Sequence, residues 1–312
     1  MITFDKLKIV ASIDAIVVTD FDAFEKVEKA GRLTTLKFYQ ESPFLLMIKV
    51  DYQEQEVVVE FCGKVLGRDY PQLISADTIR KCFDNISALG FCSIDAEAML
   101  DGDVVKADVT KDIHGVDVPQ LTRYIQSHIS NYHQYVSRLM RNGNLVIEKN
   151  VTTRKMKKRM TIYDKGKEMQ KVENKRFVEA YGLEHAFDDT CRFEVNLNSM
   201  EQVRTALLID NTRLKNVLVS SASPIYDFMT SIIGRENPEQ RPVQMSSRKE
   251  YFTRLVLQDC QYDLAKVEAR MRELYPQRGT NFKQVMKPYR EMMEKQTQPG
   301  AYDFQTVLNK LR

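Results

Sequence analysis

The chain has 312 residues, of which 43% are hydrophobic, and it carries a formal net charge of +3 at pH 7. This composition is typical of a globular protein with a packed core and excludes a largely disordered chain. The sequence contains no apolar run of the roughly 18 to 20 residues that span a bilayer. Residues 1–8 carry charges where a signal peptide needs an apolar segment, which favours a cytoplasmic protein with no membrane partner.

The cysteines indicate the redox environment. There are five of them, an odd number, and no two are spaced as Cys-x-x-Cys. This pattern argues against a disulfide framework and against a cysteine zinc site. We therefore expect reduced thiols in a cytoplasm.

The first hundred residues are expected to form a sheet with one inserted helix. β-rich runs cover residues 33–39, 44–50 and 54–61, and the turn sequence Gln-Glu-Ser-Pro separates the first two. Apolar residues at helical spacing between Ser75 and Gly90 predict the helix.

The next hundred residues continue the same mixture. Residues 104–113 alternate as a strand, and residues 118–139 show the spacing of a helix that ends before the turn sequence Arg-Asn-Gly-Asn. Further strands are expected at 145–149, 160–165 and 191–197. We therefore predict an α+β fold with a curved antiparallel sheet and flanking helices.

After about residue 200 the pattern becomes helical. Helices are expected at 200–219, 224–233, 251–257, 264–274 and 281–293, with a polar linker at 234–242. The expected division is therefore a first domain, 1–200, and an all-helical region, 201–312. A break at 276–280 is compatible with a helix-turn-helix-like DNA-binding module in 246–312. Ordinary helix packing explains the same pattern.

Positive charge is concentrated between Lys149 and Arg176. Eleven basic and three acidic residues give this segment about +8 and leave the rest of the chain at about −5. Such a stripe is expected of a polyanion binder, whereas a solvated surface with no partner explains the charge alone equally well. The candidate DNA contacts in it are Arg154, Lys155, Lys157, Lys158, Arg159 and Lys167.

Three of the expected strands have a polar face, because side chains alternate across a strand. The three sets are Asp108, Thr110 and Asp112; Arg192, Glu194 and Asn196; and Arg159, Thr161, Tyr163 and Lys165. If the strands are neighbours, the carboxylates can hold Mg²⁺ or Mn²⁺. A tyrosine oxygen can then attack phosphorus while the cations hold phosphates. Taken alone, each face is more simply explained as the solvent side of a sheet.

The order of four short stretches resembles that of plasmid and phage rolling-circle replication initiators, including the filamentous-phage initiator and the plasmid Rep_trans families. The stretches are Glu60–Gly67, Lys106–Asp112, Met160–Glu168 and Cys191–Leu197. The resemblance covers about residues 1–197 and implies a rolling-circle nuclease-like fold. It also implies a metal-dependent endonuclease that nicks one strand of origin DNA through a tyrosine. The products would be a 5′-phosphotyrosine link and a free 3′ hydroxyl that primes synthesis.

The resemblance implies roles for particular residues. Tyr163 would be the nucleophile, with Lys165 as a second catalytic residue. The candidate metal ligands are Asp108, Glu194, Asp112 and Glu148. The candidate phosphate contacts are Arg192, Lys165 and Lys167.

The sequence departs from such initiators in three ways. Lys106 stands where arginine is usual, and the four histidines contain no His-hydrophobe-His pair, so that carboxylates would have to hold the metal ion. The choice of nucleophile also stays open, because other tyrosines flank Tyr163 in the sequence. They are Tyr124, Tyr132, Tyr135 and Tyr181.

Two functions from different classes therefore stand side by side. One is the nicking and joining enzyme, and the other is a non-enzymatic initiator or repressor that binds origin DNA and recruits host proteins. The partners expected are origin DNA (double-stranded, nicked or single-stranded) and a host helicase or polymerase, and a homodimer is compatible with either function. RNA binding is less favoured, because the strand motifs lack clustered aromatic residues.

Overall fold

The computed structural model describes residues 2–129, 134–153, 157–233, 247–260, 264–275, 282–296 and 304–312. The chain divides into two compact units, residues 1–237 with 304–312 and residues 238–303. The α+β class, the large antiparallel sheet and the C-terminal helices expected from the sequence are confirmed. None of the described helices is long and apolar enough to cross a membrane.

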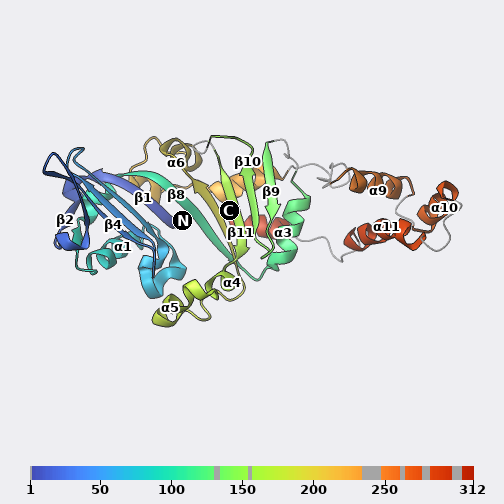
Figure 1. The fold of residues 1–312 in the computed structure, drawn as a ribbon, viewed down its shortest axis with the longest axis horizontal. Helices are drawn as coiled ribbons and strands as arrows, with labels where there is room; N and C mark the ends of the chain where they lie inside the picture. The colour runs from blue at the N-terminus through green and yellow to red at the C-terminus, as the bar shows by residue number, and fades with distance from the viewer. Residues whose placement is uncertain are drawn as a thin grey trace. The chain divides into compact units, whose positions relative to one another are not determined.

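A ten-stranded sheet runs through the first unit in the order β3-β4-β5-β6-β1-β8-β12-β11-β10-β9, and Figure 1 shows it from β4 to β9. Its strands are β1 (Phe4–Ser12), β3 (Glu25–Lys29), β4 (Arg32–Gln40), β5 (Leu46–Asp51), β6 (Glu56–Cys62), β8 (Asp103–His114), β9 (Tyr135–Leu139), β10 (Leu145–Lys149), β11 (Arg159–Asp164) and β12 (Thr190–Leu197). All neighbouring strands are antiparallel. The N-terminal strand β1 lies in the middle of the sheet, between β6 and β8. A smaller sheet pairs β2 (Ile16–Val18) with β7 (Cys92–Ile94).

Alternation of side chains gives the large sheet an apolar face and a polar face. Helices cover the apolar face, where α1 (Ile79–Ser87) places the Phe83 ring 6.1 Å from the Phe61 ring of β6. Helices α6 (Met200–Leu207) and α8 (Pro224–Ile232) contact β8 and β12. A short helix, α2 (Ala96–Leu100), contacts β1. The polar side chains of the strands gather on the opposite face.

Three short helices close one end of the polar face. They are the 3₁₀ helix η3 (Gly63–Gln72), α4 (Lys165–Met169) and α5 (Val172–Tyr181). Their apolar side chains form a cluster of Tyr70, Leu73, Met169, Phe177, Leu183 and Phe187. Because this cluster lies over the ends of β11 and β12, the polar residues beneath it are shielded from water.

The prediction of a helix over residues 118–139 is wrong in its second half. Helix α3 (Val118–Ser127) is shorter, and Tyr135–Leu139 forms strand β9, which pairs with β10. An Asn-Gly turn at 142–143 joins these strands, with Gly143 at φ +86°. Asn-Gly favours the backbone conformation of a hairpin turn, so hairpin pairing outweighs the helical spacing of the apolar residues.

The first helix of the helical region begins at Met200, as expected, but it is shorter than expected. The helix expected at 200–219 is broken, since Leu208 adopts a left-handed conformation after α6 and a separate α7 (Leu214–Leu218) follows. Helices α6, α7 and α8 all contact β8. The first compact unit therefore extends past the boundary expected at residue 200. The last helix, α12 (Phe304–Leu311), packs against α8 and β8 and belongs to the same unit.

The second unit contains helices α9 (Arg248–Asp259), α10 (Leu264–Leu274) and α11 (Phe282–Gln296). They pack around a cluster formed by Leu257, Cys260, Val267, Met271, Phe282 and Met286. The expected linker at 234–242 and the expected break at 276–280 lie outside the described residues.

Candidate functional site

Three neighbouring strands carry the polar residues singled out from the sequence. Strand β12 lies between β8 and β11, and the register pairs Asn196 with Asp108 and Glu194 with Thr161. The three polar strand faces therefore form one continuous surface. Asp108, Glu194 and Tyr163 lie on it together, because each occupies the polar side of its strand.

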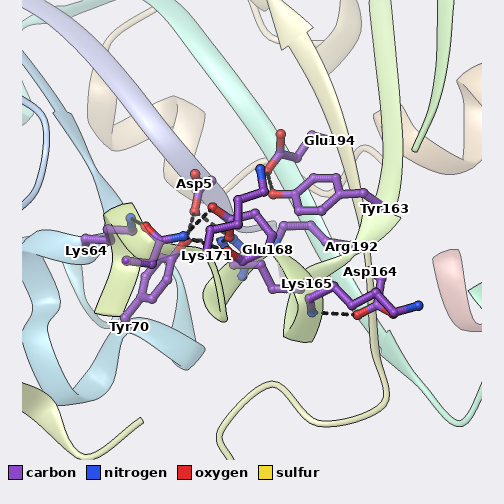
Figure 2. Close-up of polar contacts among 12 residues, drawn as sticks. Asp5, Lys64, Tyr70, Tyr163, Asp164, Lys165, Glu168, Lys171, Arg192 and Glu194 are labelled. Carbon is purple, nitrogen blue, oxygen red and sulfur yellow. Dashed lines mark hydrogen bonds and ion pairs between the residues drawn. The ribbon is translucent and has the colours of Figure 1, made fainter. Parts of the chain in front are cut away.

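Tyr163 and Glu194 form a close polar pair in this surface. The Tyr163 hydroxyl donates a hydrogen bond of 2.6 Å to Oε1 of Glu194, as Figure 2 shows. Burial and, to a smaller extent, the Asp5 carboxylate raise the pKa of the Glu194 carboxyl to about 7, while Arg192 opposes the shift. Burial also raises the pKa of the Tyr163 phenol, and the neighbouring Glu194 adds to that shift. A carboxylate in this position can accept the phenol proton.

Arg192 is the fully enclosed centre of the site. Its side chain is 0% exposed, and its Nε and one terminal nitrogen each donate a 2.7 Å hydrogen bond to Asp112. The other terminal nitrogen donates to Asp5 at 2.8 Å and to the Tyr70 hydroxyl at 2.9 Å. The geometry does not support the expected phosphate contact, because the guanidinium faces protein groups and has no exposed surface. Asp112 is likewise occupied, with both oxygens bound to Arg192.

Asp5 joins the site from β1, and the sequence analysis did not single it out. The pairing of β1 with β8 shifts register between Phe4 and Lys6, so Asp5 is an extra residue at a bulge. Its carboxylate accepts hydrogen bonds from Arg192 and from the Tyr70 hydroxyl. Two successive polar residues, Asp5 and Lys6, interrupt the alternation of this strand, and this interruption is the feature of the sequence that indicates the bulge.

Lys165 is the first residue of α4 and is 2% exposed. Its Nζ donates to Oε2 of Glu168 at 2.6 Å and lies 5.0 Å from the centre of the Tyr70 ring. Burial lowers the pKa of the Lys165 ammonium, and Arg192 lowers it further. Figure 2 shows the group. Lys165 is therefore held in an internal ion pair and is enclosed in the described conformation.

The carboxylates expected to hold a metal ion each contact another side chain. Asp108 accepts a 2.6 Å hydrogen bond from Asn196, and burial raises the pKa of its carboxyl. Glu148 forms an ion pair with Lys157 at 2.9 Å. Across the described parts of the chain, no three His, Cys, Asp or Glu side chains are grouped so that they could hold a metal ion.

A groove of about 540 Å³ runs along the polar face beside these residues. Its lining residues are Lys6, Lys8, Glu60, Lys106, Ala107, Asp108, Glu148, Thr152, Lys157, Arg159, Asn196 and Asn198. Five of them are cationic and three are acidic, so the groove favours an anion. Two of the cations, Lys157 and Arg159, are among the DNA contacts expected from the sequence. Lys6 and Lys8 are not among them, although both alternate with the buried Leu7 and Ile9.

The other expected DNA contacts lie elsewhere or lie outside the described residues. Lys158 lines a separate pocket beside Tyr135. The exposed Lys167 pairs with Asp164 at 3.1 Å. Arg154 and Lys155 lie outside the described residues.

The alternative tyrosines occupy packing positions. The Tyr135 ring lies 5.3 Å from the Phe228 ring of α8, and the Tyr124 ring stacks on His128 at 3.9 Å. Tyr181 packs against Phe177 with 5.0 Å between the ring centres. Tyr132 lies outside the described residues. Among the four described tyrosines of this set, Tyr163 donates a hydrogen bond from its hydroxyl to a carboxylate of the polar face.

Comparisons of the chain with protein-family models, with curated proteins and with solved structures find no match.

Proposed function

We propose that this protein is a replication initiator that nicks and rejoins one strand of origin DNA, with Tyr163 as the nucleophile. The observation that carries the proposal is the 2.6 Å hydrogen bond from the Tyr163 hydroxyl to Glu194 on a surface that also holds a cationic groove. A nucleophilic hydroxyl needs an adjacent proton acceptor. A DNA strand needs cations that hold its phosphates.

The proposed reaction is a transesterification. As Glu194 takes the phenol proton, the Tyr163 oxygen bonds to phosphorus and the bond from phosphorus to the 3′ oxygen breaks. The proton on Glu194 can pass to the leaving oxygen, which yields a 5′-phosphotyrosine and a free 3′ hydroxyl. Asp108 and Asn196 pair with each other two residues along their strands from Thr110 and Glu194, and both line the groove. In this proposal the bound strand approaches Tyr163 from the groove.

Gel electrophoresis after denaturation in SDS tests the chemistry. The substrates are mixed-sequence single-stranded DNA and a supercoiled plasmid carrying the DNA that flanks the coding sequence, with Mg²⁺, Mn²⁺ or EDTA. Wild type should form a protein–DNA adduct that survives SDS. Tyr163→Phe should lose the adduct and bind DNA as wild type does, while Tyr181→Phe is the matched control. An adduct that persists in Tyr163→Phe assigns the nucleophile to another residue.

A second candidate function is an initiator or repressor that binds origin DNA without cutting it. One observation favours it: the Tyr163 side chain is only 8% exposed. The two candidates share DNA binding and differ in the adduct. Binding of the flanking DNA without any adduct, with each of the two metal ions, would select the second candidate.

A further inference from the structure

The polar face does not stop at the candidate groove but continues over the N-terminal half of the sheet. A second groove, of about 680 Å³, lies over β1, β4, β5 and β6. Its lining residues are Lys8, Val10, Ala23, Glu25, Lys37, Phe38, Tyr39, Met47, Lys49 and Val58. Lys8 lines both grooves, so the two are contiguous.

The strand register connects the grooves through one row of side chains. Tyr39 pairs with Met47, Met47 with Glu60, Glu60 with Lys8, and Lys8 with Lys106. These residues lie on five neighbouring strands, so the row crosses the sheet at right angles to the strands. From β4 to β11 the polar face spans six strand spacings, or about 29 Å at roughly 4.8 Å each.

The charge of the second groove is positive. Lys8, Lys37 and Lys49 line it together with a single acidic residue, Glu25. Lys8 and Lys6 share the carboxylate of Glu60, at 3.0 and 2.6 Å. Two lysines on one carboxylate leave a net positive charge at the junction of the grooves. Lys49 also pairs with Asp51 at 2.8 Å, a carboxylate outside the lining of the groove. With that carboxylate counted, three lysines face two acidic residues, so the second groove still favours an anion.

Tyr39 adds an aromatic surface to this charge. It is 65% exposed, which is unusual for so large a ring, and it lies on the polar face beside Lys37 and Lys49. Exposed aromatic rings bordered by cations are the usual way in which proteins hold single-stranded nucleic acid, since any base can stack on the ring. A duplex offers no free base face to such a ring.

We propose that the second groove is a binding subsite for single-stranded DNA, in which Tyr39 stacks on a base and Lys37 and Lys49 hold the adjoining phosphates. It would hold the part of the strand that lies away from Tyr163, on the far side of Lys8 and Lys106. The proposal rests on the proposed function for the choice of DNA as the ligand. Its test measures binding and does not depend on nicking.

Fluorescence anisotropy with a labelled, mixed-sequence 24-nucleotide single strand tests the stacking. Tyr39→Ala should weaken binding about tenfold, as expected for the loss of one stacked base. Tyr39→Phe should bind as wild type, because it keeps the ring. Binding of a duplex of the same sequence should change less than twofold in either variant. Equal weakening of single strand and duplex, or no weakening of the single strand, would overturn the proposal.

Salt titration of the same complex tests the lysines. Lys37→Ala should reduce the slope of log K against log salt by about 0.7, the value for one phosphate contact on a single strand. The matched control is Lys81→Ala, since Lys81 lies on α1, on the opposite side of the sheet, and pairs with Asp69. An unchanged slope in Lys37→Ala contradicts the phosphate contact. Tighter binding of the equivalent RNA strand would contradict the choice of DNA.

The outcomes separate the two proposals. Tyr163→Phe leaves the second groove intact, so it should retain the Tyr39-dependent binding. A protein that never forms an adduct but loses single-strand binding in Tyr39→Ala would keep the subsite and lose the nicking activity. If the protein forms the adduct and Tyr39→Ala binds single strands as wild type does, the nicking activity stands and the subsite is wrong.

Discussion

Arg192 brings a positive charge into a fully enclosed position, which is costly unless the charge is paired and hydrogen-bonded. Four hydrogen bonds, to Asp112, Asp5 and Tyr70, provide that pairing. The arrangement joins β12 to β8 and β1 and fixes the residues around Glu194. Arg192 therefore acts on the site by holding its carboxylates in place.

Removing the Arg192 guanidinium should destabilise the first unit strongly. Arg192→Met leaves two mostly buried carboxylates, Asp5 and Asp112, without their partner. The free energy of unfolding should fall by about 3–5 kcal/mol, as for other broken buried ion pairs. Urea denaturation followed by circular dichroism measures it. The control is Arg138→Met, which removes an exposed arginine 3.7 Å from Glu148 and should cost at most about 1 kcal/mol. Equal losses of unfolding free energy in the two variants would contradict the structural role of Arg192.

The raised pKa of Glu194 predicts a pH-dependent stability. In the folded protein the Glu194 carboxyl holds its proton up to about pH 7, whereas in the unfolded chain it releases the proton near its ordinary pKa of 4.5. Between these values the folded state binds more protons than the unfolded state, so stability falls as the pH rises. Glu194→Gln removes this titration. Relative to wild type, the variant should gain up to roughly 3 kcal/mol on going from pH 4 to pH 8.

Urea denaturation at pH 4, 6 and 8 measures that difference. Glu54→Gln, which replaces an exposed carboxylate in the turn between β5 and β6, is the matched control and should follow wild type. A constant difference between wild type and Glu194→Gln across the three pH values would show that Glu194 ionises normally.

The alternation of a strand predicts which face a residue occupies but not how deeply it is buried. Arg159 and Arg192 were both placed on polar faces and assigned to DNA. Arg159 lines the groove, whereas Arg192 is fully buried and donates a hydrogen bond to Tyr70 of η3. The difference arises from segments that fold over one end of the sheet, which the local pattern of β12 does not contain.

At the level of secondary-structure elements, η3 depends on one glycine. Gly67 has φ +60° and ψ −119°, a conformation that costs a residue with a side chain about 1–3 kcal/mol. A Cβ at this position would also lie 2.6 Å from the Tyr181 ring of α5. The close approach of η3 to α5 therefore requires glycine here.

Gly67→Ala should accordingly lower the free energy of unfolding by about 2 kcal/mol or more, because backbone strain adds to displacement of the Tyr181 ring. Gly90→Ala separates the two effects. Gly90 has φ +91°, and a Cβ there would have no neighbour within 4 Å. Thermal unfolding of both variants measures the difference. If Gly67→Ala is no less stable than Gly90→Ala, the contact with Tyr181 is not restrictive.

Individual strands were easier to predict than their partners. β8 and β12 follow from alternation, and their polar residues were placed on the correct face. The segment of β9 was predicted to be helical because Tyr135, Val136 and Leu139 fit both helical and strand spacing. Its pairing with β10 decides in favour of a strand. The position of β1 between β6 and β8 follows from contacts between distant parts of the chain. Asp5 entered the site through that pairing and its bulge.

On the scale of the whole molecule, the chain leaves the first unit after residue 237 and returns to it as α12. Phe304, Val307 and Leu311 of α12 are buried. The Ser223 hydroxyl, just before α8, donates to the carbonyl of Arg312 at 3.3 Å. The start of α8 and the end of α12 are therefore adjacent. Because the two helices have similar lengths and pack together, the end of α8 also lies near the start of α12.

This geometry determines how the second unit can be removed. Replacing residues 238–303 with a ten-residue Gly-Ser linker should leave the urea stability of the first unit within about 1 kcal/mol of its value in the full chain. Ending the chain at residue 237 also removes three buried apolar side chains, each worth about 1.5–3 kcal/mol when fully buried. It should destabilise the unit by several kcal/mol. Equal stability of the two variants would show that α12 contributes little.

The same pair of variants decides whether the second unit selects the origin. A truncation that removes residues 246–312 would lose α12 as well, so weaker DNA selectivity could reflect an unfolding first unit. The linker variant avoids this, because it keeps α12 and the polar face. If α9–α11 recognise DNA sequence, the variant should bind mixed-sequence single strands as the full chain does and lose its preference for the flanking DNA. Competition binding measures that preference, and a preference retained by the linker variant would place sequence recognition in the first unit.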